Sequence, residues 1–147
     1  MVFLRDEGSL FDAPLEAVWE FVGSGDTHSS AHRHVDSHRE RHSELSGTYS
    51  WAQEFDGRRT PFRMRWTSFW PLGIAYEVLV GPFTGSKFFI YYEGRGEKTA
   101  VGLVGEFVSP EIPDAALPAA VDRFFTREYE QDNTALRDRH RPPPPAR

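Results

Sequence analysis

The chain contains no cysteine among its 147 residues. Disulfide bonds, thiolate metal sites and a cysteine nucleophile are therefore excluded. The sequence also has no apolar run long enough to span a bilayer. Its first residues, MVFLRDEGSLF, are interrupted by Arg5, Asp6 and Glu7 where a signal peptide would need an apolar stretch. We therefore expect a cytoplasmic protein that does not span a membrane.

An excess of positive charge is also missing. The formal net charge is −5 with neutral histidines, which disfavours nucleic acid or an anionic membrane surface as the main partner. A phosphate-binding glycine loop is absent too, because Gly94 and Gly96 lack the third glycine and lie between two expected strands. The sequence thus predicts no nucleic-acid partner and no cofactor.

Aromatic residues are abundant. Twelve phenylalanines, five tyrosines and four tryptophans make up 14% of the chain. A chain of this length forms one domain with a sizeable core. This aromatic content indicates either a large core or an aromatic-lined cavity.

The strongest periodic signal predicts a long amphipathic helix from Asp114 to Asp138, with Asp114 as its N-cap. Its apolar face, spaced at three and four residues, contains Leu117, Ala120, Val121, Phe124, Phe125, Tyr129 and Leu136. The other face contains Arg123, Thr126, Arg127, Glu130, Asn133 and Arg137. A helix with three aromatic residues on one face needs a broad apolar surface to pack against.

Glu128 interrupts this apolar face, and Asp132 follows one turn later. Glu128 either points into a cavity or lies solvated at its mouth, since a buried carboxylate needs a partner or a raised pKa. The expected alternation of the strand that contains Arg63 and Arg65 turns both arginines outward, which favours the solvated position.

The rest of the chain predicts short helices and antiparallel strands. Val2–Phe11 reads as a strand, Pro14 begins a helix that ends at Gly23, and Asp26 caps a second short helix from Thr27 to about Val35. Further strands are expected at 39–46, 48–55, 61–70, 74–80, 86–93 and 98–108, joined mostly by tight turns. Short connections favour antiparallel pairing, so the fold class is α+β.

The helix start at Ala13-Pro14, followed by Val18-Trp19, resembles the START-like superfamily, also called SRPBCC or Bet v 1-like, which includes polyketide cyclases. The resemblance extends over residues 2–138 by element order. It implies a helix-grip fold, in which a curved antiparallel sheet of about seven strands wraps around a long C-terminal helix. We expect one domain at 1–138 and a disordered, proline-rich tail at 139–147.

The resemblance also implies a hydrophobic cavity between the sheet and the last helix. We expect it to bind a lipid, polyketide or similar molecule, in a monomer or a homodimer. The large inward-facing residues predicted to line it, with two polar groups, are Trp51, Phe62, Met64, Trp66, Tyr76, Phe88, Ile90, Phe124, Phe125, Glu128 and Tyr129. These aromatic residues could instead fill the interface without leaving a void.

Five histidines fall within fifteen residues: His28, His32, His34, His38 and His42. His28 and His32 have the i, i+4 spacing that can bind a transition metal on one helix face. However, no carboxylate completes a known pattern such as HExxH, and arginines are interleaved with the histidines. We therefore expect a solvated, pH-sensitive surface rather than a metal site.

The sequence does not identify catalytic residues. Ser43, Ser46 and Ser50 lie near His38 and His42, but no nucleophile-elbow pattern surrounds them. An enzyme of the cyclase or dehydratase type, with Glu128, Tyr129 or a histidine as acid or base, is one alternative to ligand binding. A protein-interaction module is the other.

Overall fold

The computed structural model of the chain describes residues 1–139 and 145–146. The elements follow in the order β1 (Val2–Phe11), α1 (Leu15–Val22), α2 (Asp26–Ala31), β2 (Val35–Ser43), β3 (Ser46–Phe55), β4 (Arg58–Phe69), β5 (Gly73–Val80), β6 (Lys87–Arg95), β7 (Lys98–Phe107) and α3 (Leu117–Arg139). The expected tail at 139–147 lies mostly outside the described residues, and Arg139 is the last residue of α3.

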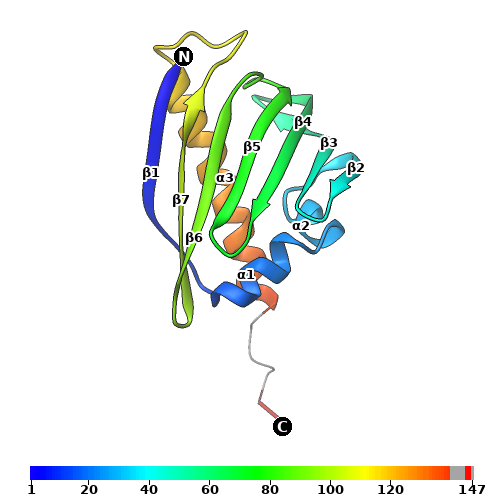
Figure 1. Ribbon diagram of the computed structural model, residues 1–147, viewed down its shortest axis with the longest axis vertical. Helices are drawn as coiled ribbons and strands as arrows, with labels where there is room; N and C mark the ends of the chain where they lie inside the picture. The colour runs from blue at the N-terminus through cyan, green and yellow to red at the C-terminus, as the bar shows by residue number, and fades with distance from the viewer. Residues whose placement is uncertain (140–144, 147) are drawn as a thin grey trace.

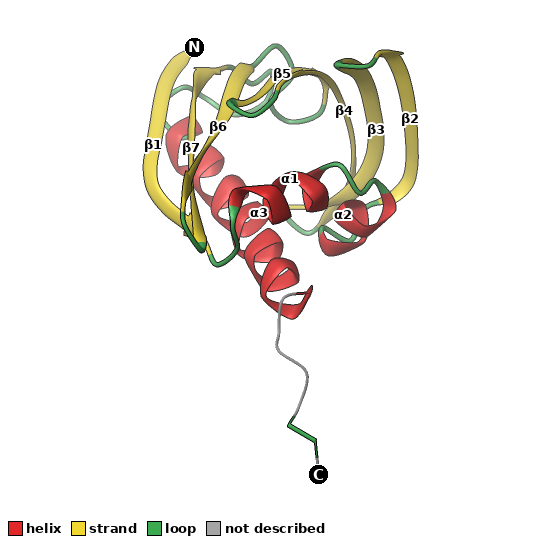
Figure 2. Ribbon diagram, turned by 60° about the horizontal axis from the view of Figure 1, so that its bottom comes forward, coloured by secondary structure: helices red, strands yellow, loops and turns green. Residues whose placement is uncertain are grey.

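The strands form one seven-stranded sheet in the order β1-β7-β6-β5-β4-β3-β2, and every neighbouring pair is antiparallel. Figure 2 shows this sheet curving around α3, with α1 and α2 lying across its open side. Register shifts, which bend a strand, occur in β1 between Asp6 and Ser9 and between β4 and β5 at Arg63/Met64. The predicted helix-grip architecture is confirmed.

The core forms two clusters along α3. The larger one packs the N-terminal half of α3 against the inner face of the sheet, with Phe62, Phe83, Phe107 and Phe124 at its centre. The smaller one joins α1, the end of β1 and the C-terminal half of α3 around Leu136. Figure 1 shows α3 running behind the sheet, with its C-terminal end near α1.

Both ends of α2 differ from the expectation. Asp26 makes no capping hydrogen bond, since Gly25 at φ 63° precedes α2 instead. The helix ends at Ala31, and β2 begins at Val35, three residues before the period-two pattern was expected to start at His38. The result places His32 and His34 in the connection between α2 and β2.

The expected start of α3 and one of its polar-face positions also need correction. The helix begins at Leu117, and Asp114 pairs with the amino group of Met1 at 2.6 Å instead of capping it. Asn133, expected on the polar face, is buried. Its Oδ1 accepts a hydrogen bond from the backbone N–H of Asp12 at 2.9 Å, and so ties α3 to the start of α1. No helix among the described residues is both long and apolar enough to cross a membrane.

Candidate functional site

A cavity of about 420 Å³ lies between the inner face of the sheet, α3 and the two short helices. Strand alternation builds its sheet wall, because every second residue of a strand faces the same side. Met64, Trp66 and Ser68 of β4 line the cavity, while the intervening Arg65 and Thr67 do not. The cavity occupies the side of the core nearest to α1 and α2.

The structure brings together most of the residues predicted to line a cavity: Trp51, Met64, Trp66, Tyr76, Phe88, Ile90, Phe124, Phe125 and Glu128. Phe62 is not among the lining residues. Its ring lies between Trp51 and Phe124, with centroid distances of 5.2 and 5.7 Å, and fills the core instead. Binding of a ligand by these residues stays a prediction.

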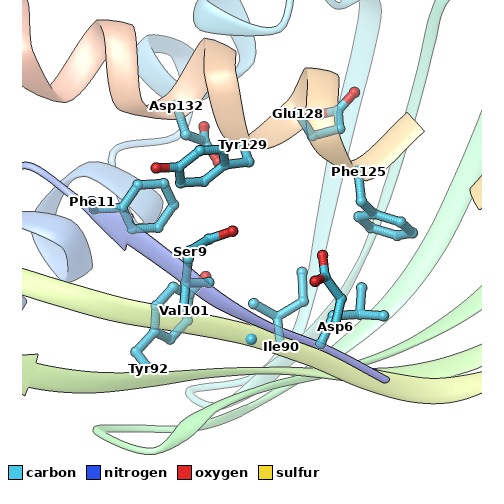
Figure 3. A pocket seen from close by; sticks show the side chains of 12 residues that line it. Asp6, Ser9, Phe11, Ile90, Tyr92, Val101, Phe125, Glu128, Tyr129 and Asp132 are labelled. Carbon is cyan, nitrogen blue, oxygen red and sulfur yellow. The ribbon is translucent and has the colours of Figure 1, made fainter. Parts of the chain in front are cut away.

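Tyr129 also lies elsewhere. It lines a smaller cavity of about 80 Å³ between β1, β6, β7 and α3. Its ring stacks on Phe11 at 5.2 Å, as Figure 3 shows, and its hydroxyl donates a hydrogen bond to the carbonyl of Leu10. Glu128 and Asp132 line both cavities.

Aromatic residues that the sequence did not assign to the cavity complete its wall. Trp19 of α1 lies edge-on to Tyr92 at 5.3 Å and to Trp70 at 6.4 Å. All four tryptophans of the chain line the cavity. The sequence offered a signal for Trp19 only through the Val18-Trp19 pair of the START-like resemblance, which did not place Trp19 in the cavity wall.

Three of the five clustered histidines lie against the cavity, which corrects the expectation of a solvated surface. Their positions follow from α2 and its connection to β2: His28 and His32 face α3, and His34 faces Tyr49 and Trp51. His38 and His42 lie on β2, which is exposed, and His42 Nε2 contacts Thr48 Oγ1 at 2.7 Å.

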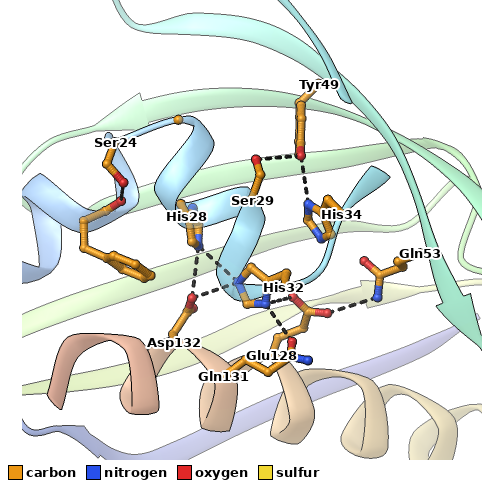
Figure 4. Close-up of polar contacts among 12 residues, drawn as sticks. Ser24, His28, Ser29, His32, His34, Tyr49, Gln53, Glu128, Gln131 and Asp132 are labelled. Carbon is orange, nitrogen blue, oxygen red and sulfur yellow. Dashed lines mark hydrogen bonds and ion pairs between the residues drawn. The ribbon is translucent and has the colours of Figure 1, made fainter. Parts of the chain in front are cut away.

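The polar centre of the cavity is formed by α2 and α3. Figure 4 shows His28 and His32 above Asp132 and Glu128. His32 Nε2 lies 2.8 Å from Asp132 Oδ1 and 3.1 Å from His28 Nε2, and His28 Nε2 lies 3.1 Å from the same Oδ1. Asp132 is the carboxylate that the local sequence around the histidines did not contain.

Glu128 is held in place rather than free at the cavity mouth. Its Oε2 lies 2.8 Å from His32 Nδ1, and its Oε1 accepts a hydrogen bond from Gln53 Nε2 at 3.2 Å. Its side chain is 17% exposed. The expectation of a solvated Glu128 is therefore wrong, and the partner of this carboxylate is a histidine rather than an arginine of β4.

His32 lies between two carboxylates. Burial lowers its pKa, but the hydrogen bonds to Asp132 and Glu128, together with the charges of both carboxylates, outweigh burial and raise the pKa of His32 to about 11. For Asp132, burial works in the other direction, and the hydrogen bonds to His28 and His32 hold its pKa at about 2. Without other ligands, these two side chains form an ion pair.

His34 behaves differently. Burial, reinforced by the charges of His32 and His28, lowers its pKa to about 3, so its imidazole is neutral. Its ring stacks on Trp51 at 4.7 Å, and Nδ1 contacts the Tyr49 hydroxyl at 2.8 Å. His34 therefore continues the aromatic wall of the cavity rather than adding charge to it.

Comparisons with known proteins identify the fold. No protein-family model matches the chain, and no curated protein matches it in sequence. Among solved structures, the aromatase/cyclase Zhui from Streptomyces sp. R1128 matches with a TM-score of 0.78 and 16% identity, over 95% of this chain and 97% of that one.

Two further structures show how broad this likeness is. Ara h 8.0201 matches with a TM-score of 0.73 and 9% identity, over 93% of this chain and 98% of its own. A START superfamily protein from Mycobacterium smegmatis matches with a TM-score of 0.71 and 12% identity, over 92% and 97%. The chain thus has the helix-grip fold of START-like and Bet v 1-like proteins. At these identities the likeness shows the fold alone.

Proposed function

We propose that the protein binds a hydrophobic small molecule, predominantly aromatic, in the cavity between the sheet and α3. The observation that carries this proposal is the cavity itself. Its volume of about 420 Å³ falls within the range of small-molecule sites, and its wall is mostly apolar and aromatic, with polar and charged side chains among the lining residues. Flat rings pack well against such walls through offset-stacked and edge-to-face contacts.

The polar end supports a ligand that has oxygen substituents. His28 and Asp132 line the cavity, with side chains 25% and 18% exposed. Arg39 also lines it, and its guanidinium lies 4.4 Å from the ring centre of Tyr49. A hydroxyl or carbonyl group on the ligand would find hydrogen-bond partners here, while the rest of the molecule would pack mostly against rings and aliphatic side chains.

The turn between β4 and β5 is the proposed entrance. Trp70 lines the cavity and is 65% exposed, so the cavity reaches the surface at this residue. Phe69 and Leu72 beside it are exposed as well. Apolar side chains at a cavity rim shorten the passage of a hydrophobic ligand through water.

Tryptophan fluorescence tests the proposal directly, because every tryptophan of the chain lines the cavity. Titration with a hydroxylated anthraquinone, a long-chain fatty acid and anilinonaphthalene sulfonate should change this emission saturably for the aromatic compounds. Native mass spectrometry should show one molecule bound per chain. If no compound in a broad panel of lipids and polyketides changes the emission or the mass, the proposal is wrong.

A cavity-filling substitution sharpens this test. Ser68→Phe adds a ring inside the cavity and should weaken binding of the anthraquinone at least about tenfold, which corresponds to about 1.4 kcal/mol. Thr67→Phe is the matched control, because Thr67 is the adjacent residue of β4 and does not line the cavity. Equal affinities of the two variants would place the binding site elsewhere.

A second candidate function is acid–base catalysis on the bound molecule. The buried Glu128–His32–Asp132 chain supports it, since general acids and bases require positioned, hydrogen-bonded groups. Aromatase/cyclases among the structural neighbours suggest cyclisation and aromatisation as the reactions to assay. Glu128→Gln should then reduce turnover of a substrate that wild type converts. Unchanged turnover would remove Glu128 from the mechanism.

A further inference from the structure

Three donor atoms at the polar end of the cavity form a nearly equilateral triangle. They are His28 Nε2, His32 Nε2 and Asp132 Oδ1, and their separations are 2.8, 3.1 and 3.1 Å. Two of the side chains come from one face of α2 and its C-terminal end, and the third comes from α3. The triangle therefore joins two helices that are about 100 residues apart in the chain, as the separation of 104 between His28 and Asp132 records.

Protons alone cannot satisfy all three contacts while Asp132 is ionised. If both Nε2 atoms are protonated, each donates to the carboxylate, but the two N–H groups then face each other across 3.1 Å. If only one is protonated, the lone pair of the other nitrogen faces the carboxylate oxygen. Every distribution of these protons leaves one side of the triangle without an attractive hydrogen bond.

A metal ion at the centre satisfies all three contacts at once. With metal–ligand bonds of about 2.1 Å, adjacent ligands of an octahedral ion lie about 3.0 Å apart, and those of a tetrahedral ion about 3.4 Å apart. The separations observed here match one face of an octahedron. Two imidazoles and one carboxylate on a common face are a ligand set for first-row transition metals.

We propose that His28, His32 and Asp132 bind one divalent transition-metal ion, of the range from iron to zinc, in octahedral geometry at the wall of the cavity. The three atoms lie within 3.1 Å of one another, close enough to share one ion without rearrangement of the backbone. The three side chains are partly or fully buried: His32 is 6% exposed, and the side chains of His28 and Asp132 are 25% and 18% exposed.

The surroundings of His32 fit a metal ligand. Its Nδ1 lies 2.8 Å from both Glu128 Oε2 and Gln131 Oε1, so Nδ1–H donates and Nε2 is left free for the metal. A carboxylate on the far nitrogen orients the ring and raises its basicity, as is usual for histidines that bind metals. Gln53 in turn donates to Glu128 at 3.2 Å. The second layer of contacts that a metal site requires is therefore present.

The remaining positions of an octahedral ion would face away from the three ligands. Since all three ligands line the cavity, these positions are open to water or to an oxygen atom of a bound molecule. The metal site goes beyond the proposed ligand binding and does not depend on it, because all three ligands belong to the protein. It would give a ligand with vicinal oxygen atoms an additional anchor.

Metal titration of the ligand-free, chelator-treated protein tests this inference. We expect one Co²⁺ per chain, with weak visible d–d absorption typical of six-coordinate geometry, and competition by Zn²⁺ measured by calorimetry. Asp132→Asn and His28→Gln should each lower the affinity for Co²⁺ by more than about 100-fold. Losing a residue that only hydrogen-bonds to a metal ligand usually lowers the affinity about 10–100-fold. Glu128→Gln should fall within that 10–100-fold range.

The control is the double variant His38→Gln/His42→Gln, which removes two exposed histidines of β2 outside the triangle. It should bind Co²⁺ like wild type. The inference is overturned if this control abolishes binding, if both Asp132→Asn and His28→Gln bind normally, or if wild type binds no Co²⁺ or Zn²⁺. Thermal unfolding of each variant without metal shows whether it is folded. Because the two ligand variants change different helical segments, the test still holds if one of them does not fold.

Discussion

Replacing Phe107 with alanine should lower the free energy of unfolding by about 3–5 kcal/mol, the usual loss for a phenylalanine truncated in a core. Phe107 is fully buried at the end of β7. Its ring lies 5.5 Å from Phe88 and 5.9 Å from Phe125, measured between ring centres. These neighbours are held by β6 and α3, so they cannot collapse into the space that the missing ring leaves. Urea denaturation followed by circular dichroism measures the change.

Phe3→Ala is the control for this prediction, because Phe3 lies on the neighbouring strand β1, opposite Glu106, but is 68% exposed. Its effect should stay within about 0.5 kcal/mol. A loss below about 1.5 kcal/mol for Phe107→Ala would contradict the close packing of this half of the core.

The two halves of the interior differ in packing, and this difference organises the molecule. Around Phe107, rings fill the space between sheet and helix. Nearer to α1 and α2, the same sheet face leaves a cavity. The two regions share residues, because Phe88 and Phe124 are buried in the packed cluster and also line the cavity. Ser68 lines the cavity without belonging to the cluster, so its substitution for binding assays should cost less stability than that of a shared ring.

Element order and strand alternation carried the fold prediction. The inward positions of β4 follow from strict period two, so Met64 and Trp66 could be placed on the inner face from the sequence. Phe124 and Phe125 likewise follow from the helical period of α3. Helix ends were less predictable. Asp114, the expected N-cap of α3, instead forms an ion pair with the amino group of Met1, which is far away in sequence.

The polar centre could not be derived, because its partners are distant in the chain. His28 and His32 form one i, i+4 pair, and Glu128 and Asp132 form another, and both spacings are visible in the sequence. Nothing in the sequence shows that α2 packs on α3, which the structure establishes. A search for complementary i, i+4 pairs of histidines and carboxylates on separate helices would have raised the possibility.

The largest effect of added metal should appear in thermal stability. At a free Zn²⁺ concentration 100 times its dissociation constant, the folded protein should gain about 2.7 kcal/mol, because the ion binds the assembled triangle of His28, His32 and Asp132. For a chain of this size, the melting temperature should rise by roughly 5–11 °C. Differential scanning fluorimetry with and without chelator measures the shift.

Binding of Zn²⁺ to histidines of the unfolded chain would reduce the stabilisation of the folded protein. A variant of the triangle therefore shows whether the ion binds there. Asp132→Asn keeps all six histidines and thus the affinity of the unfolded chain, but it removes one ligand of the folded site. Its melting temperature should rise by less than about a third of the wild-type shift, since a 100-fold weaker site is only half occupied at the same Zn²⁺ concentration. An equal rise in wild type and Asp132→Asn would show that the ion binds elsewhere, because only the folded triangle requires this carboxylate.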